Sequence, residues 1–69
     1  MKLFVKDGCE YCSKVNVDNI NVKIINVSNK EYEGVMPPNV PLLQFYNDYQ
    51  LADMNLINTI FDEIRKGTI

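Results

Sequence analysis

Two apolar, β-branched segments near the N-terminus, with room for a short helix between them, predict a compact strand–helix–strand unit. Residues 2–6 alternate in polarity, with Leu3 and Val5 on one face, and predict a first strand. Residues 22–27 predict a second, buried strand. The stretch between them leaves room for a short helix of about two or three turns that begins at residues 9–12. The crossover of such a βαβ unit should be right-handed.

The second half of the chain predicts a hairpin. Residues 28–34 can hold at most a turn or two of helix, because two consecutive prolines follow. Residues 42–46 predict a third strand and residues 49–51 a short fourth strand. The turn-forming pair Asn47-Asp48 lies between them.

The clearest predicted helix is the last one. Its apolar side chains recur at helical spacing and are Leu56, Ile57, Ile60, Phe61 and Ile64. Asp53 or Asn55 could cap its start, and Gly67 fits its C-terminal cap. The predicted order is β-α-β-(α)-β-β-α. We therefore expect a single α/β domain over residues 1–69, with a small four-stranded mixed sheet flanked by helices.

Composition excludes several classes of function. The 69 residues carry seven basic and nine acidic side chains, a net charge of −2, and no Lys/Arg cluster, so no nucleic-acid surface is predicted. Apolar runs are too short to span a membrane. Charges at Lys2, Lys6 and Asp7 do not fit a signal peptide. We expect a cytoplasmic, monomeric protein.

The two cysteines, Cys9 and Cys12, form a Cys-x-x-Cys motif between the first strand and the first helix. A bridge across two residues closes too small a loop to stabilise the fold much. In a reducing compartment this spacing is typical of redox sites. Other interpretations are two buried thiols, half of a zinc site, or a fold that serves only as an interaction module. Because the chain has no histidine, we expect no resident metal.

The position of each cysteine predicts its role. Cys9 would lie at the N-terminus of a helix, where free N–H groups stabilise a thiolate, so it is the expected nucleophile. Cys12 would lie one turn further along and would resolve a mixed disulfide formed by Cys9. Lys6 and Lys14 should favour the thiolate, whereas Asp7 and, from closer by, Glu10 should oppose it.

Residues 4–14 resemble the active-site segment of glutaredoxins, which reads Lys-x-x-Cys-Pro-Tyr-Cys-x-Lys. The matching positions are Lys6, Cys9, Tyr11, Cys12 and Lys14. Glu10 replaces the proline of the family. Residues 39–41, Asn-Val-Pro, resemble the family's Thr-Val-Pro, and residues 51–57 fall where it has Ile-Gly-Gly and a capped final helix. The resemblance covers essentially the whole chain and implies a thioredoxin-like, glutaredoxin fold.

The resemblance also implies a glutathione site. It implies a cis peptide bond at Val40-Pro41, packed against the cysteine pair. The residues carried over as glutathione contacts are Lys6, Tyr11, Val40, Pro41, Asp53 and Met54. Ala52-Asp53 replaces the family's Gly-Gly and places a negative charge beside an expected carboxylate. Asp53 could instead contact the glutathione ammonium group, or act only as an N-cap.

The expected activity is thiol–disulfide exchange, with Cys9 and Cys12 as catalytic residues. Glutathione would be the reductant and co-substrate, not a bound cofactor. The resemblance implies disulfide-containing clients such as a ribonucleotide reductase or glutathionylated proteins. One alternative is a thioredoxin-like donor recycled by a flavin reductase. Another, of a different class, is an iron–sulfur carrier in which Cys9 and glutathione hold the cluster.

Overall fold

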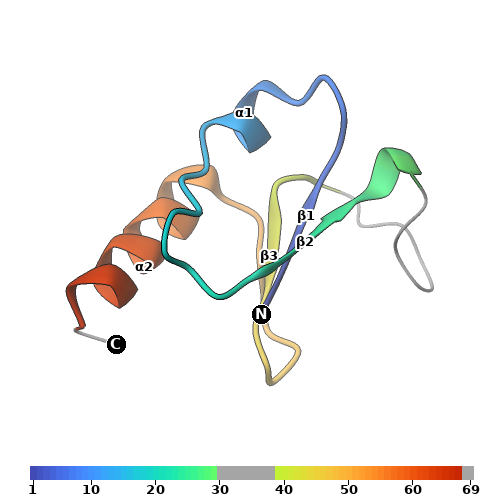
Figure 1. Ribbon diagram of the computed structural model, residues 1–69. Helices are drawn as coiled ribbons and strands as arrows, with labels where there is room; N and C mark the ends of the chain where they lie inside the picture. The colour runs from blue at the N-terminus through green and yellow to red at the C-terminus, as the bar shows by residue number, and fades with distance from the viewer. Residues whose placement is uncertain (30–38, 68–69) are drawn as a thin grey trace.

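The computed structural model describes residues 1–29 and 39–67, and its centre is a mixed β-sheet (Figure 1). The strands in these ranges are β1 (Lys2–Val5), β2 (Lys23–Asn26), β3 (Leu42–Gln44) and β4 (Gln50–Leu51). Their order in the sheet is β2-β1-β3-β4. β1 runs parallel to β2 and antiparallel to β3, and β3 pairs antiparallel with β4. The predicted four-stranded mixed sheet is confirmed.

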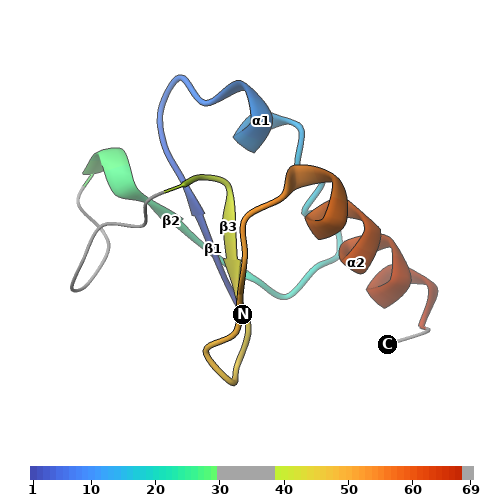
Figure 2. The same ribbon diagram turned by 180° about the vertical axis from the view of Figure 1, so that it is seen from behind.

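Two α-helices and one 3-10 turn accompany the sheet in the described residues. They are α1 (Glu10–Ser13), η1 (Val27–Asn29) and α2 (Met54–Lys66). Figures 1 and 2 show α2 beside the sheet, on the same side as the chain that follows α1. They also show α1 at one end of the sheet and the turn between β3 and β4 at the other. Of residues 28–34, where a turn or two of helix was expected, those from 30 onwards lie outside the described residues.

The core is divided between the two faces of the sheet, because successive side chains of a strand point to opposite sides. One cluster contains Leu3, Val15, Leu43, Ile57 and Phe61. The other contains Phe4, Ile25, Val27 and Leu42. Helix α2 contributes to the first cluster through Ile57 and Phe61, which are both fully buried.

The prediction of two or three turns for the first helix was wrong, because α1 ends at Ser13. From Val15 to Val22 every residue is β-branched or is Asn or Asp, and these residues favour other conformations. Side chains of α2 bind their backbone instead. The amide of Asn58 donates to the Lys14 carbonyl (3.0 Å) and accepts the Asn16 N–H (2.9 Å). The guanidinium of Arg65 donates to the carbonyls of Asn16 (3.1 Å) and Asp18 (2.9 Å).

Two burial predictions were also wrong. β2 was expected to be buried, yet it lies at the end of the strand order, with Ile25 buried and Ile24 49% exposed. An edge strand has a neighbour on one side only, so part of its surface faces solvent. Leu56 was assigned to the apolar stripe of the last helix, but its side chain is 50% exposed. It follows the capping turn, one position before the buried Ile57.

The predicted caps of the last helix and the predicted hairpin turn are confirmed. Asp53 caps the start of α2, and Gly67 ends the helix with a left-handed φ of 78°. The hairpin turns at Asn47 and Asp48 as predicted, and Asp48 has a φ of 65°. No helix in the described ranges is both long and apolar enough to cross a membrane.

Candidate active site

Cys9 is positioned by a turn that leaves the end of β1. Gly8 has a φ of 73°, a conformation that side chains with a β-carbon adopt rarely. Cys9 follows in an extended conformation as the N-cap of α1. Its Sγ accepts the backbone N–H of Cys12 at 3.1 Å, and the two residues form a disulfide with Cα atoms 5.2 Å apart. Both cysteines are partly exposed. The motif thus places the sulfur of Cys9 at the start of a helix and joins it to the sulfur of Cys12.

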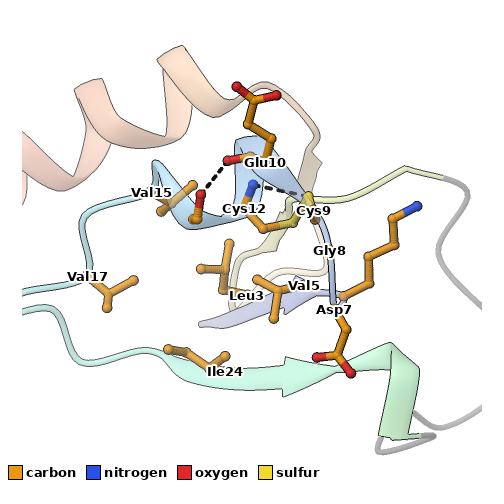
Figure 3. Close-up of a pocket in the computed structure, with 12 residues that line it drawn as sticks. Leu3, Val5, Asp7, Gly8, Cys9, Glu10, Cys12, Val15, Val17 and Ile24 are labelled. Carbon is orange, nitrogen blue, oxygen red and sulfur yellow. Dashed lines mark hydrogen bonds between the residues drawn. A yellow bond between two sulfur atoms is a disulfide. The ribbon is translucent and has the colours of Figure 1, made fainter.

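The turn before Cys9 is held by polar bonds to the end of β2. The Asp7 N–H donates to the Ser28 hydroxyl at 2.9 Å. The side chain of Asn26 donates to the Asp7 carboxylate at 2.9 Å. This carboxylate points away from the disulfide in Figure 3. These bonds fix the backbone of the turn and direct the charge of Asp7 away from the sulfur atoms.

Val40, in the second half of the chain, contacts Cys9. Its carbonyl oxygen lies 4.0 Å from the Cys9 Sγ. In the disulfide form the sulfur carries no proton, so this is a van der Waals contact. A reduced Cys9 thiol could donate to the same oxygen. The peptide bond Val40-Pro41 is cis, as predicted, and Pro41 is buried.

The charges around the motif partly cancel. The Lys14 ammonium lies 3.4 Å from the Glu10 carboxylate and 5.6 Å from the centre of the Tyr11 ring. The side chains of this ion pair are 52% and 78% exposed, so water screens it. In Figure 3 the Glu10 carboxylate points away from the sulfur atoms. The two charges that were expected to act on Cys9 in opposite senses, those of Lys14 and Glu10, therefore pair with each other.

Most of the residues carried over as glutathione contacts line one groove. The groove has a volume of about 240 Å³. Its lining residues in the described ranges are Tyr11, Val40, Pro41, Ala52, Asp53, Met54 and Asn55. Five of the six predicted contacts are therefore brought together, next to the Cys9–Val40 contact. Lys6 is not among them and lines a different cleft.

That second cleft was not foreseen from the sequence. It has a volume of about 610 Å³, and both cysteines line it (Figure 3). Apolar side chains of β1, β2 and the segment after α1, among them Val5, Val17 and Ile24, line the rest together with Leu3 and Lys6. Val15 and Val17, which lie in the segment where a longer helix was expected, are among the residues that line the cleft. Its presence leaves the disulfide open to solvent from this direction.

The start of α2 carries its own carboxylate. The Oδ1 atom of Asp53 accepts the N–H groups of Asn55 (2.9 Å) and Leu56 (3.1 Å). Of the roles considered for Asp53, the N-cap is the one seen. The resemblance implied glutathione contacts at the start of this helix at Asp53 and Met54, and the cap bonds occupy the next two amides along the chain.

Comparisons with known proteins identify no relative of this chain. No family model matches it, and neither a curated protein nor a solved structure matches it. Its function has to be inferred from the geometry around Cys9 and Cys12.

Proposed function

We propose that this chain is a glutaredoxin-like thiol–disulfide oxidoreductase with a thioredoxin-like fold. One observation carries the proposal. Cys9 caps a one-turn helix, its sulfur accepts the Cys12 N–H at 3.1 Å, and it lies 4.0 Å from the carbonyl of Val40, at the edge of a groove. A sulfur held by an N–H donor and open to solvent is suited to act as a thiolate.

The proposed reaction is a two-step exchange. The Cys9 thiolate attacks one sulfur of a client disulfide, forms a mixed disulfide and releases the other client sulfur as a thiolate, which takes up a proton. Cys12 then loses its proton and attacks Cys9, and the second client thiol leaves. The client gains two electrons and two protons, and the protein ends with the Cys9–Cys12 bond. The Cα separation of 5.2 Å suits both ends of this cycle.

The groove would hold the part of the client next to its reactive sulfur. Val40 offers backbone polar groups beside Cys9, and Tyr11, which is 59% exposed, offers an aromatic face at the rim. Met54 and Asn55 supply the opposite side of the groove. An extended client segment suits a small groove of about 240 Å³ better than a folded surface does.

Glutathione is the proposed reductant. Two glutathione molecules would reduce the Cys9–Cys12 bond in turn and leave as glutathione disulfide. The proposed clients are proteins with a disulfide or a bound glutathione, a ribonucleotide reductase among them. We place the protein in the cytoplasm, where such thiols are kept reduced.

A second candidate keeps the exchange chemistry and changes the reductant. The Asp53 carboxylate caps the N–H groups of Asn55 and Leu56 and so holds a negative charge where a glutathione carboxylate is expected. This favours a thioredoxin-like donor that a flavin-dependent reductase recycles. The two candidates differ in the source of electrons and not in the roles of Cys9 and Cys12.

The test is steady-state reduction of a glutathionylated peptide with either electron source. With glutathione and glutathione reductase, we expect turnover by the wild-type chain and a loss of at least about 100-fold in Cys9→Ser. Turnover only with a thioredoxin reductase would favour the second candidate. No turnover from either source, with both thiols reduced at the start, would contradict the proposed function.

A further inference from the structure

Asp53 is the charged side chain of the groove beside Cys9. The other described residues that line it are neutral: Tyr11, Val40, Pro41, Ala52, Met54 and Asn55. Asp53 is exposed, so its carboxylate meets solvent and any ligand that enters. Among the described residues that line the groove, Asp53 therefore supplies the one charge, and the Lys14 ammonium lies outside it, 5.6 Å from the centre of the Tyr11 ring.

The partial positive charge at the start of α2, the helix that begins in the groove, does not compensate the negative charge of Asp53 for a ligand. α2 is 13 residues long, and its N-terminal amides would ordinarily attract an anion. Here Oδ1 of Asp53 accepts two of these amides, from Asn55 at 2.9 Å and from Leu56 at 3.1 Å. The partial positive charge of the helix start is directed at a carboxylate of the chain itself. A ligand carboxylate would have to displace this cap or lie next to it.

A cationic group of a ligand, in contrast, would be attracted to Asp53. Only Oδ1 of Asp53 serves the cap bonds, so a carboxylate can hold the helix start and still accept from a lysine or arginine of a ligand. The aromatic ring of Tyr11 lines the same groove and already attracts one cation, since the Lys14 ammonium lies 5.6 Å from its centre. Met54 and Ala52 add apolar surface for the stem of a long basic side chain.

We propose that Asp53 makes the groove select disulfides that are flanked by a basic residue over disulfides flanked by a carboxylate. The preferred client is then an extended segment of a protein with Lys or Arg next to its reactive cysteine. Glutathione carries two carboxylates and one ammonium group, so its net charge is negative and it is a poorer ligand of this groove than such a segment. The inference rests on the proposed exchange at Cys9 and adds the class of client.

The test uses three peptides that differ only in the residues beside one cysteine, which are Lys, Ala or Glu. Each cysteine carries a neutral hydroxyethylthio group as its disulfide partner. Reduced protein is mixed with each peptide, and the second-order rate of disulfide reduction is measured. At low salt we expect the Lys peptide to react about fivefold or more faster than the Glu peptide. The ratio should approach one at about 0.5 M salt, where charges are screened.

Asp53→Asn separates charge from capping, because Asn caps a helix about as well as Asp. In this variant we expect the Lys/Glu ratio to fall to below about twofold. Asp48→Asn is the matched control, since it removes the same charge at the hairpin turn, at the far end of the sheet from α1 (Figure 1). Asn also tolerates the φ of 65° at this position. The control should keep the wild-type ratio.

The outcomes separate the inference from the proposed function. Reduction of the Ala peptide with a Lys/Glu ratio near one in the wild-type chain would overturn the inference and leave the exchange activity standing. A ratio that Asp53→Asn leaves unchanged, or that Asp48→Asn lowers equally, would also overturn it. No reduction of any peptide would contradict the proposed function, and the inference with it.

Discussion

The Sγ atom of Cys9 lies 4.0 Å from the carbonyl oxygen of Val40, a residue 31 positions further along the chain. This contact joins the redox motif to the groove that Val40 shares with Tyr11 and the start of α2. It places the bond that would break during exchange at the edge of a surface that can hold a client. A client bound to Cys9 should therefore change the surroundings of the groove residues.

A client trapped on Cys9 should perturb the groove. In Cys12→Ser, which cannot resolve a mixed disulfide, a peptide thiol should stay attached to Cys9. We expect the amide signals of Tyr11, Val40 and Asn55 to shift in ¹⁵N NMR spectra when the adduct forms. Signals of the turn between β3 and β4 should stay unchanged, since Figure 1 shows that turn at the other end of the sheet. Shifts confined to the turn would contradict the assigned binding groove.

Glu10→Gln should change the reactivity of Cys9 very little. The Glu10 carboxylate pairs with Lys14 at 3.4 Å and points away from the disulfide (Figure 3). Because the pair is exposed, its loss should cost no more than about 1 kcal/mol of stability. We expect the rate of Cys9 alkylation by iodoacetamide to rise less than about twofold at low salt. A tenfold rise would show that this carboxylate acts directly on the sulfur.

Asn58→Ala should destabilise the segment that follows α1. The Asn58 side chain makes two bonds to it, with the Lys14 carbonyl at 3.0 Å and the Asn16 N–H at 2.9 Å. Loss of both should lower the free energy of unfolding by about 1–3 kcal/mol. For a domain of this size each kcal/mol corresponds to a fall of roughly 4–8 °C in Tm, measurable by circular dichroism.

Asn21→Ala is the control for Asn58→Ala, because Asn21 belongs to the same connection and its side chain is exposed. Its effect on the free energy of unfolding should stay within about 0.5 kcal/mol. Equal Tm values for Asn58→Ala and the wild-type chain would mean that the two bonds do not hold the segment.

Phe61→Ala should unfold much of the protein, whereas Leu56→Ala should be tolerated. Phe61 is fully buried in the core between α2 and the sheet, and its truncation should cost about 3–5 kcal/mol. That is a large share of the stability of a small domain. Leu56 on the same helix is 50% exposed and should cost at most about 1 kcal/mol. Urea titrations of both variants check the difference, and similar midpoints would contradict the packing of α2.

The sequence predicted best where short-range signals decide the structure. Asp53 and Gly67 cap α2 through bonds to neighbours two to four positions away, so the local sequence was enough to predict both helix ends. The turn at Asn47-Asp48 is local in the same sense. The cis bond at Val40-Pro41 is different, because it was predicted from the resemblance and not from the residues themselves.

The wrong predictions concern contacts between distant parts of the chain. The spacing of Cys12, Val15 and Ile20 suggested a longer helix, and Val15 and Ile20 do reach the core. They do so from an irregular segment, because Asn58 and Arg65 bind the backbone that a helix would have satisfied by itself. Val15 and Val17 of this segment line the cleft that the cysteines share, so the cleft was not predicted either.

The exchange of one disulfide between a client and the Cys9–Cys12 pair is tested most directly by a stoichiometric transfer followed by mass spectrometry. Reduced protein is mixed with one equivalent of the neutral Ala peptide, and samples are quenched by acid over time. We predict a transient peptide adduct on Cys9 and then protein that has lost two hydrogen atoms to a Cys9–Cys12 bond, while Cys12→Ser stops at the adduct. Thiols that stay reduced throughout, or an adduct that forms on Cys12 in Cys9→Ser at the wild-type rate, would contradict the account.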